Sequence, residues 1–301
     1  MKFKMIIAND FCESVRDGTH DSPKRTDKGY KLITSKHIKD NYIDFESAYY
    51  ISREDFDKVN SRSLVEVNDI LYSMIGTIGL IYRVKEEPNF AIKNMGLFKV
   101  KDEIKSKWLF YYLKSPKMMN YMRTLLSGST QQYVTLKNLR NLPIEFPENT
   151  DDAKKIIQIL ETIDQKIELN NQINGNLHEL VNSIYIDYVS NINDYNSNRT
   201  EIKNIAKCIL GGTPSRSKEE YWKGNINWIN SGEINKFRII EPSEYITDLG
   251  LSKSSTTLLP KRTTVLAITG ATLGQVSRLE VASCANQSVI GIVPNDLKLN
   301  N

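Results

Sequence analysis

The stretch that most constrains the fold is residues 151–189, which reads DDAKKIIQILETIDQKIELNNQINGNLHELVNSIYIDYV. Its apolar residues recur at alternating spacings of four and three, the a/d repeat of a helix that packs against another long helix. Asp151 and Asp152 stand where a helix N-terminus favours negative charge. The sequence therefore predicts a long helix over 151–190. The positions on its predicted seam are Ile156, Leu160, Ile163, Ile167, Asn170, Asn174, Leu177, Val181, Ile184 and Tyr188.

The middle of this seam is polar, at Asn170 and Asn174, with Gly175 beside them. A buried Asn in such a seam costs stability but fixes the register and the number of paired helices. The alternative is a helix that lies along its own domain. The length of the repeat, and flanks that look like separate domains, favour a helix that pairs through its seam.

Length and charge indicate how the rest of the chain is organised. A chain of 301 residues is long enough for roughly two domains. We predict a first domain at 1–150, a spacer helix at 151–190, and a linker with a partial second domain at 191–301. The net charge is +5 over 1–150, −4 over 151–200 and +3 over 201–301. Two basic regions around an acidic helix are compatible with two nucleic-acid-binding domains.

Several classes of protein are disfavoured. No apolar run approaches the ~18 residues of a membrane span, and the apolar stretch after Met1 is too short for a secretory signal. The cysteines Cys12, Cys208 and Cys284 are odd in number and scattered, which fits a reducing cytoplasm rather than a disulfide framework. With only three histidines, we expect no His-rich metal site.

The regions before and after the predicted helix resemble each other. Tyr245-Ile246-Thr247 matches Tyr50-Ile51-Ser52 at a shift of 195 residues, and at the same shift Gly79 falls on Gly274 and Gly96 on Gly291. A nearly constant shift, with glycines and strand-like residues in step, predicts an internal duplication. Asn301 then corresponds to Ser106, so 107–190 has no counterpart and we expect the second copy to be incomplete. The missing part is either truncated or supplied by another polypeptide.

Local patterns predict a mixed α/β (α+β) fold in both copies. Strand-like runs are expected at Tyr30–Thr34, Leu80–Val84 and Ala91–Val100, and a helix with one apolar face at Lys105–Leu126. The aromatic residues Tyr111, Tyr112, Trp222 and Trp228 are interpreted as core residues rather than as base-stacking platforms.

The motifs of common active sites are absent from the sequence. It has no GxxxxGK[ST] phosphate loop, no GxGxxG, no HExxH, no Cys-x-x-Cys, no GxSxG and no Asn/Asp-Pro-Pro-aromatic motif. We therefore expect no catalytic residues, no metal site and no cofactor in this chain.

Polar loops between the short strands carry the side chains that DNA reading needs. Lys and Arg neutralise phosphates, while Gln, Asn, Arg and Ser bond to base edges. The candidate DNA-binding residues are Thr19, His20, Lys24, Arg25, Lys36, Thr77, Ser129, Thr130, Gln131, Gln132, Thr213, Ser215, Arg216, Thr272, Asn286 and Gln287.

Together these features resemble the specificity subunit of type I restriction–modification systems. The residues that carry the resemblance are Leu210–Ser215, Tyr221–Gly224, Ile226–Ile234, Thr269–Gly274, Asn286-Gln287, Ser127–Gln132 and the helix Ile156–Tyr188. The first copy departs from the pattern at Thr19-His20, where the second has Thr213-Pro214.

The resemblance implies two target-recognition domains that each read half of a split DNA site, with a spacer helix that sets the gap. It also implies docking of methyltransferase subunits and, through them, of restriction subunits, with S-adenosylmethionine, ATP and Mg²⁺ chemistry on those partners. Because the second copy is incomplete, we expect the seam of Ile163, Ile167, Leu177 and Val181 to pair with a second copy or a separate C-terminal fragment.

Two other interpretations remain open. The chain could be the recognition part of a DNA methyltransferase, which binding of S-adenosylmethionine by the isolated chain would reveal. It could also be a truncated assembly protein that binds methyltransferase subunits without reading DNA. That protein would show no preference among duplexes at a fixed salt concentration.

Overall fold

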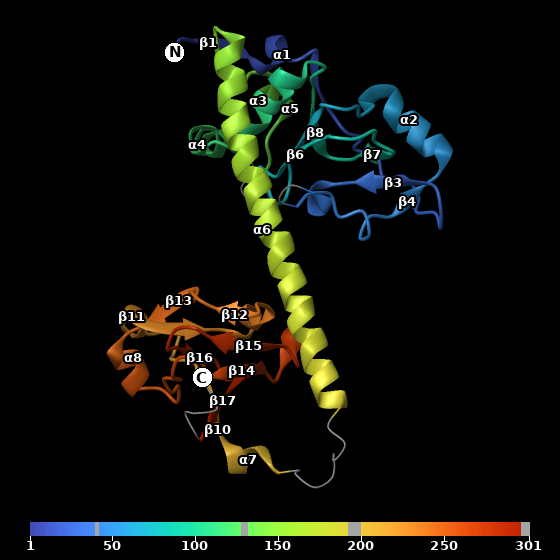
Figure 1. The fold of residues 1–301 in the computed structure, drawn as a ribbon. Coiled ribbons are helices and arrows are strands. Elements are labelled where there is room, and N and C mark those ends of the chain that lie inside the picture. The colour runs from blue at the N-terminus through green and yellow to red at the C-terminus, as the bar shows by residue number, and fades with distance from the viewer. Residues whose placement is uncertain (40–41, 128–131, 192–199, 296–301) are drawn as a thin grey trace. The chain divides into compact units, whose positions relative to one another are not determined.

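The computed structural model describes residues 1–39, 42–127, 132–191 and 200–295. Contacts divide the chain into two units, Met1–Asn182 and Ser183–Asn301, which are described separately (Figure 1). Within the described ranges, no helix is long and apolar enough to cross a membrane.

The first unit is built on two sheets packed face to face. The antiparallel sheet has the order β2-β8-β5-β6, and the second sheet has the order β4-β3-β7 with β3 and β7 parallel. The strands are β2 (Ser14–Asp17), β3 (Tyr30–Ile33), β4 (Tyr50–Ile51), β5 (Ile70–Ser73), β6 (Ile81–Arg83), β7 (Phe90–Ile92) and β8 (Met95–Lys99). Leu71, Leu97 and Ile92 lie in the core between the two sheets.

Helices cover the other face of the antiparallel sheet. They are α1 (Ala8–Phe11), α3 (Glu103–Lys114), α4 (Pro116–Thr124) and α5 (Leu136–Arg140), while α2 (Arg53–Ser63) packs near β7. Leu109, Met118 and Leu139 from these helices form one core with Tyr72 and Phe98 of the sheet. The antiparallel sheet is therefore buried on both faces, which explains why all residues of β5 and β8 are buried.

The structure corrects two of the predicted elements. The single helix predicted over Lys105–Leu126 is two helices, because Ser115 caps α4 through the Met118 N–H and Pro116 begins a new helix. The strand predicted over Ala91–Val100 is β7 and β8, which belong to different sheets. Asn94, with φ of 53°, turns the chain between them.

A strand not predicted from the sequence begins the chain. The segment β1 (Phe3–Ile7) pairs antiparallel with β9 (Pro143–Pro147), which leads into the long helix. The start of the chain is thereby attached to the base of the helix.

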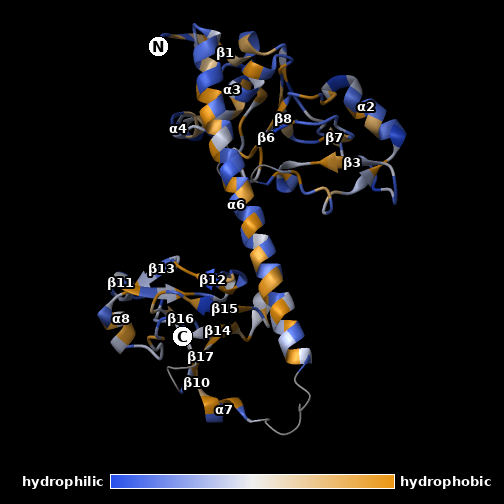
Figure 2. Cartoon of the chain, in the orientation of Figure 1, coloured by the Kyte–Doolittle hydropathy of each residue, from blue (hydrophilic) through white to orange (hydrophobic). Residues whose placement is uncertain are grey.

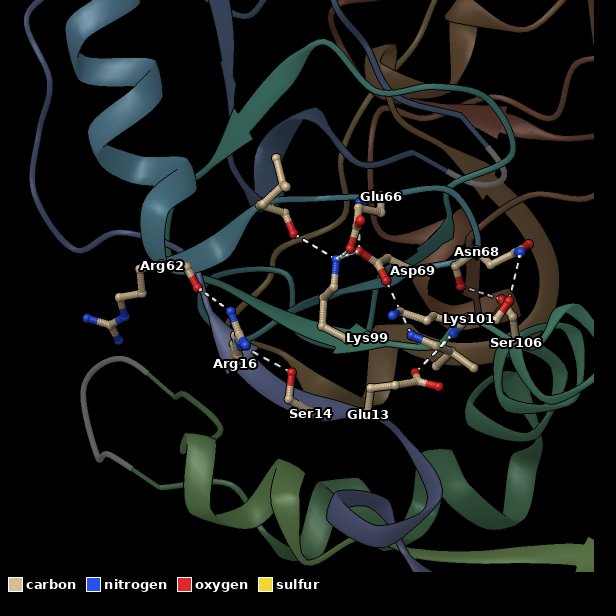
Figure 3. Close-up of polar contacts among 12 residues, drawn as sticks. Glu13, Ser14, Arg16, Arg62, Glu66, Asn68, Asp69, Lys99, Lys101 and Ser106 are labelled. Carbon is tan, nitrogen blue, oxygen red and sulfur yellow. Dashed lines mark hydrogen bonds and ion pairs between the residues drawn. The ribbon is translucent and has the colours of Figure 1, made fainter.

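A buried polar network fixes the start of β5 (Figure 3). Lys99 donates to the carbonyl of Leu64 at 2.9 Å and to Asp69 at 2.7 Å, and it pairs with Glu66. Burial raises the pKa of Asp69, whereas the hydrogen bond from Lys99 lowers the pKa of Glu66. One cation thus holds two carboxylates at the turn that leads into the central strand.

The predicted long helix is confirmed as α6 (Thr150–Ser190), a single helix of 41 residues. Ala153 and Ile157 are buried in the first unit, and the Tyr111 hydroxyl donates to Asp164 at 2.9 Å. From residue 165 to residue 188 every side chain is exposed. The helix therefore leaves its domain after about four turns.

The exposed part of α6 carries an apolar stripe along its length, visible as recurring orange bands in Figure 2. Of the predicted seam, Ile156 packs on the first unit, whereas Ile163, Ile167, Leu177 and Val181 are between 50% and 55% exposed. The apolar stripe consists of Ile159, Ile163, Ile167, Ile173, Leu177, Leu180, Val181 and Ile184.

The second unit contains two sheets of the same design. Their orders are β10-β17-β14-β15-β12 and β13-β11-β16, with β11 and β16 parallel. The strands are β10 (Ala206–Leu210), β11 (Trp222–Ile229), β12 (Arg238–Ile239), β13 (Glu244–Ile246), β14 (Thr264–Ala267), β15 (Val276–Leu279), β16 (Cys284–Ala285) and β17 (Val289–Pro294). The helices are α7 (Ile202–Ile205) and α8 (Asp248–Ser252).

Strand pairing demonstrates the internal duplication. The order β2-β8-β5-β6 recurs as β10-β17-β14-β15, and β4-β3-β7 recurs as β13-β11-β16, with the same parallel and antiparallel partners. The turn before β5 has Asn68 with φ of 73°, and the turn before β14 has Arg262 with φ of 71°. Within 200–295, the second unit has counterparts of β2 to β8 but none of α3 to α6.

The four aromatic residues predicted to be core lie in packed surroundings. Trp228 is buried and Trp222 meets it edge to face, with ring centroids 5.1 Å apart. Tyr111 and Tyr112 are half-buried against the helical core.

Candidate nucleic-acid interface

The parallel strands β3 and β7 end side by side, and several loops of the first unit meet at that point. The Lys93 N–H donates to the Ile33 carbonyl at 2.9 Å, which joins the two strand ends. The chain leaving β2 lies against them, because Thr19 N–H donates to Ile92 and Asn94 N–H donates to Thr19. The carboxyl ends of parallel strands are common ligand sites in α/β sheets. We call this set of loops, segments 18–20, 34–37, 74–79 and 93–94, the loop edge.

The turn between β5 and β6 completes the loop edge of the first unit. Gly76 and Gly79 adopt φ of 79° and 88°, a conformation that side chains with a Cβ rarely take. Gly76 faces the hydroxyl of Ser35, which begins the 3-10 turn Ser35–His37. Lys36 and Thr77 are thereby exposed on neighbouring loops.

The second unit builds the same loop edge from segments 211–213, 230–235, 268–275 and 286–288. The Asn286 N–H donates to Ile229 at 3.0 Å, as Lys93 does to Ile33, and the Thr213 hydroxyl bonds to Gln287. Gly270 and Gly274 have φ of 78° and 84° in its β14–β15 turn. Its 3-10 turns Ser231–Asn235 and Gly270–Thr272 lie side by side.

Nine of the predicted DNA-binding residues are brought to the two loop edges. In the first unit Gln132 joins them, because it shares a pocket of about 250 Å³ with Gly76 and Gly79. The residues on the loop edges are Thr19, His20, Lys36, Thr77, Gln132, Thr213, Thr272, Asn286 and Gln287.

Some of these side chains are already engaged within the protein. The two ring nitrogens of His20 lie 2.9 Å from Asn94 and from Asp17, so the ring is held in place. Among the described residues, no hydrogen bond or ion pair holds the exposed side chains of Lys36 and Thr77, so both can reach a ligand.

Four predicted residues are not brought to the loop edges. Arg25 lies over the ring of Tyr49, 5.7 Å from its centroid, and Lys24 precedes it in the chain. Arg216 pairs with Glu244 and stacks on Trp222 at 3.6 Å, and Ser215 accepts a hydrogen bond from the Trp222 indole through its carbonyl. The hydrogen bond to Glu244 raises the pKa of Arg216. Ser129, Thr130 and Gln131 lie outside the described residues.

Sequence reasoning missed Lys93 and Asn94. Asn94 contacts the His20 ring as Gln287 contacts Thr213 in the second unit, and Lys93 occupies the place of Asn286. The internal duplication could have identified them only with a local shift of 193 residues in place of 195, which sets Lys93 against Asn286 and Asn94 against Gln287, both of them candidates.

Two sheet domains that share one topology and one loop edge come before and after a long helix in the chain, which defines a tandem-domain protein. The family model described as type I restriction modification DNA specificity domain matches residues 2–179 and 196–301, and the chain belongs to that family.

Individual relatives agree with this assignment. The type I restriction enzyme EcoR124I/EcoR124II specificity subunit of Escherichia coli is 23% identical over 173 residues, which are 55% of this chain and 43% of that protein. The MjaIX specificity subunit of Methanocaldococcus jannaschii is 31% identical over 99 residues, 32% of this chain and 23% of that one. These matches span less than half of each relative's length.

A solved structure has the same fold. The S subunit of a type I restriction-modification system from M. genitalium superposes with a TM-score of 0.50 at 15% identity, over 98% of this chain and 73% of that one.

Proposed function

We propose that the chain is the DNA sequence-specificity subunit of a type I restriction–modification complex and that each unit reads one half of a split DNA site. The observation that carries this proposal is the loop edge built twice, once in each unit, from equivalent segments. Two copies of one surface, separated in the chain by a long helix, suit two half-sites with a gap between them.

The loop edges supply the chemistry of DNA reading. In this proposal Lys36 and Lys93 meet phosphates, whereas Thr77, Asn286 and Gln287 bond to base edges. The side chains differ at matching places, Lys93 in one unit and Asn286 in the other, which supports two half-sites of different sequence.

The exposed apolar stripe of α6 supports a role in assembly. We propose that α6 docks methyltransferase subunits and, through them, restriction subunits. Catalysis, with S-adenosylmethionine, ATP and Mg²⁺, then belongs to those partners, and this chain is non-catalytic. Because its proposed ligand is genomic DNA, we also propose a cytoplasmic location.

The test is co-purification with the cognate methyltransferase subunit followed by genome-wide mapping of methylated adenines. A split motif with a constant gap is the expected result. A symmetric motif, with one half repeated, would mean that two chains pair and only the first unit reads DNA. A stable complex without methylation would contradict the proposal and favour an assembly protein that does not read DNA.

A further inference from the structure

Each loop edge contains a short 3-10 turn that directly follows one of the two parallel strands of the smaller sheet. In the first unit the turn Ser35–His37 follows β3, and in the second unit the turn Ser231–Asn235 follows β11. The two turns occupy equivalent places, because the strand residue before each one, Ile33 or Ile229, accepts the hydrogen bond that joins the parallel strand ends. We call them the edge turns.

Both edge turns are closed by a capping box, in which a side chain of the turn reaches back to the residue before it. In the first unit the Thr34 N–H donates to His37 Nδ1 at 2.9 Å, and the Thr34 side chain accepts from the His37 N–H. In the second unit the Asn230 N–H donates to the Glu233 carboxylate at 3.1 Å, and the Asn230 side chain accepts in return. Glu and Gln are the usual residues at this place of the box, so the histidine is an exception.

The two closing side chains lie inside the protein, whereas their neighbours in the turns face outward. His37 is 0% exposed and Glu233 is 8% exposed. One residue earlier in each turn, Lys36 and Gly232 are exposed. His37 and Glu233 are therefore too deeply buried to touch DNA, and they act on a ligand only through the turns that they close.

The edge turn of the first unit determines where two of the predicted DNA contacts lie. Lys36 belongs to this turn, and its neighbour Ser35 lies beside Gly76. Gly76 precedes Thr77 in the turn between β5 and β6. Opening of the edge turn would therefore move Lys36 and remove a neighbour of the segment that carries Thr77.

The two closing groups differ in how their second polar atom is satisfied. Glu233 Oε2 accepts from the Ser243 N–H at 3.0 Å. His37 Nε2 is buried and, among the residues that the structure describes, has no hydrogen-bond partner. Because Nδ1 of His37 accepts from Thr34, the proton of the neutral ring is on Nε2. The closing contact of the first edge turn thus requires one tautomer of a neutral imidazole.

Protonation of His37 breaks this contact, because the added proton on Nδ1 faces the Thr34 N–H. The charged groups around the ring are Lys36, Lys39 and Asp44. Burial lowers the pKa of His37, the two lysines lower it further, and Asp44 opposes them. Since the folded-state pKa lies below the unfolded value of 6.5, the stability that His37 supplies is complete above pH 6.5. It is lost as the pH falls through the folded-state pKa.

We propose that His37 and Glu233 are positioning residues for DNA reading, each holding from inside its domain the edge turn that faces the DNA. In the first unit the neutral His37 ring is required, so recognition of the first half-site weakens in acid. In the second unit Glu233 closes the turn without a histidine. The proposal rests on the DNA-specificity function proposed above and assigns a role to two residues that do not touch the DNA.

The closed edge turn is tested first without DNA, by nuclear magnetic resonance of the chain labelled with isotopes at histidine. The chain has three histidines, and His37→Gln assigns the imidazole signals of His37 by their loss. We expect a neutral ring with its proton on Nε2 near neutral pH, and a protonation midpoint below 6.5. A ring that carries its proton on Nδ1 near neutral pH would overturn the proposal.

DNA binding then tests the positioning role. The affinity of the methyltransferase complex for a duplex with its mapped motif is measured at fixed salt from about pH 5.5 to about pH 7.5, the usual histidine range. His37→Gln keeps an acceptor for the Thr34 N–H that does not titrate in this range. Relative to His37→Gln, binding by the original chain should weaken by up to about tenfold per pH unit below the measured midpoint. His37→Leu, which has no acceptor, should bind about fivefold more weakly even near neutral pH.

Two further variants separate the positioning role from general effects of acid. His178→Gln removes an exposed histidine of α6 and should keep the pH profile of the original chain. Glu233→Leu should make the mapped motif degenerate in the second half-site only, and an unchanged motif would contradict the role of Glu233.

Equal pH profiles for the original chain and His37→Gln would overturn the role of His37 while the complex still binds its motif. Absence of any sequence preference in the original chain would overturn the DNA-specificity function as well, so the two failures are distinguishable. Neither comparison depends on whether His37→Leu folds.

Discussion

Close backbone contact at the loop edge depends on single glycines. A Cβ on Gly211 would lie 2.1 Å from the carbonyl oxygen of Asn286, and one on Gly18 would lie 2.5 Å from that of Ile92. In both units a glycine therefore allows close backbone contact between two segments. One segment follows β2 or β10, and the other lies at the end of the parallel strand β7 or β16.

Gly211→Ala should destabilise the second unit by about 1–3 kcal/mol, because a backbone carbonyl cannot move aside as a side chain can. Chemical denaturation monitored by Trp222 and Trp228 fluorescence measures this loss. Gly232→Ala is a milder control, since its new Cβ would meet only the Asn230 side chain, at 2.9 Å. Equal losses in the two variants would contradict the explanation.

Lys99→Met tests the buried polar network. The variant leaves Asp69, which is 2% exposed, without its cation, and the expected loss is about 3–5 kcal/mol of unfolding free energy. Lys101→Met removes the same charge from an exposed site nearby and should change stability by less than about 0.5 kcal/mol.

The loss in Lys99→Met should depend on pH. Burial raises the pKa of Asp69, and without Lys99 that pKa rises further, so the folded variant binds a proton more tightly than the unfolded chain. The stability of the Lys99→Met variant therefore falls as the pH rises through the pKa of Asp69 in the folded variant. In the original protein the hydrogen bond from Lys99 lowers the pKa of Glu66. The stability that ionised Glu66 supplies is therefore lost as the pH falls through that lowered pKa. Both effects make the difference in stability smaller at pH 4 than at pH 7, and a constant difference would refute this account.

At the scale of elements, α6 is one helix although its middle contains Asn170, Asn174 and Gly175. A Cβ at position 175 would meet no atom within 4 Å, so glycine has no packing role there. Its presence lowers the stability of the exposed half of the helix.

Gly175→Ala should stabilise this part of α6 by about 0.5–1 kcal/mol. Hydrogen exchange of the neighbouring backbone amides should slow by roughly two- to fivefold, because local opening becomes rarer. Gly175→Pro, by contrast, should accelerate exchange in the preceding turn. Unchanged exchange in the alanine variant would mean that another contact holds this region of the helix.

For the whole molecule, two loop edges imply two separable halves of the recognition site. Gln287→Ala removes a side chain from the second loop edge only. In the methyltransferase complex, the mapped motif should become degenerate at one position of one half-site, at a cost of about 1–3 kcal/mol for the original base. The other half and the gap should stay the same.

Lys261→Ala provides the control, because Lys261 lies in the turn before β14, at the end of that strand away from the loop edge. Its mapped motif should equal the original one. A change in both half-sites in the Gln287 variant would show that the two units do not read DNA independently.

Periodic and local signals were readable from the sequence because they act between near neighbours. The 3.5-residue period predicted α6, and matching glycines predicted the duplication, since a left-handed turn restricts the residue type wherever it occurs. Boundaries were less predictable. Ser115 and Pro116 divide one apolar run into two helices. Asn94 divides one predicted strand into β7 and β8, which join different sheets because their partner strands come from distant parts of the chain.

The candidate site was only partly readable for the same reason. Sequence composition marked Thr19, Thr77 and Gln287 as polar loop residues, but only the parallel ends of β3 and β7, and of β11 and β16, bring such loops together. Sequence composition also selected Arg216, but its guanidinium forms an ion pair with Glu244 and stacks on the Trp222 ring.

By itself, then, the sequence determined the long helix with its apolar seam and the repeat on either side of it, because both are patterns of residue type along the chain. The tertiary structure decided which loops form each edge and which polar side chains remain available. Those properties depend on strand register and on contacts between residues far apart in the chain, and no local pattern specifies them.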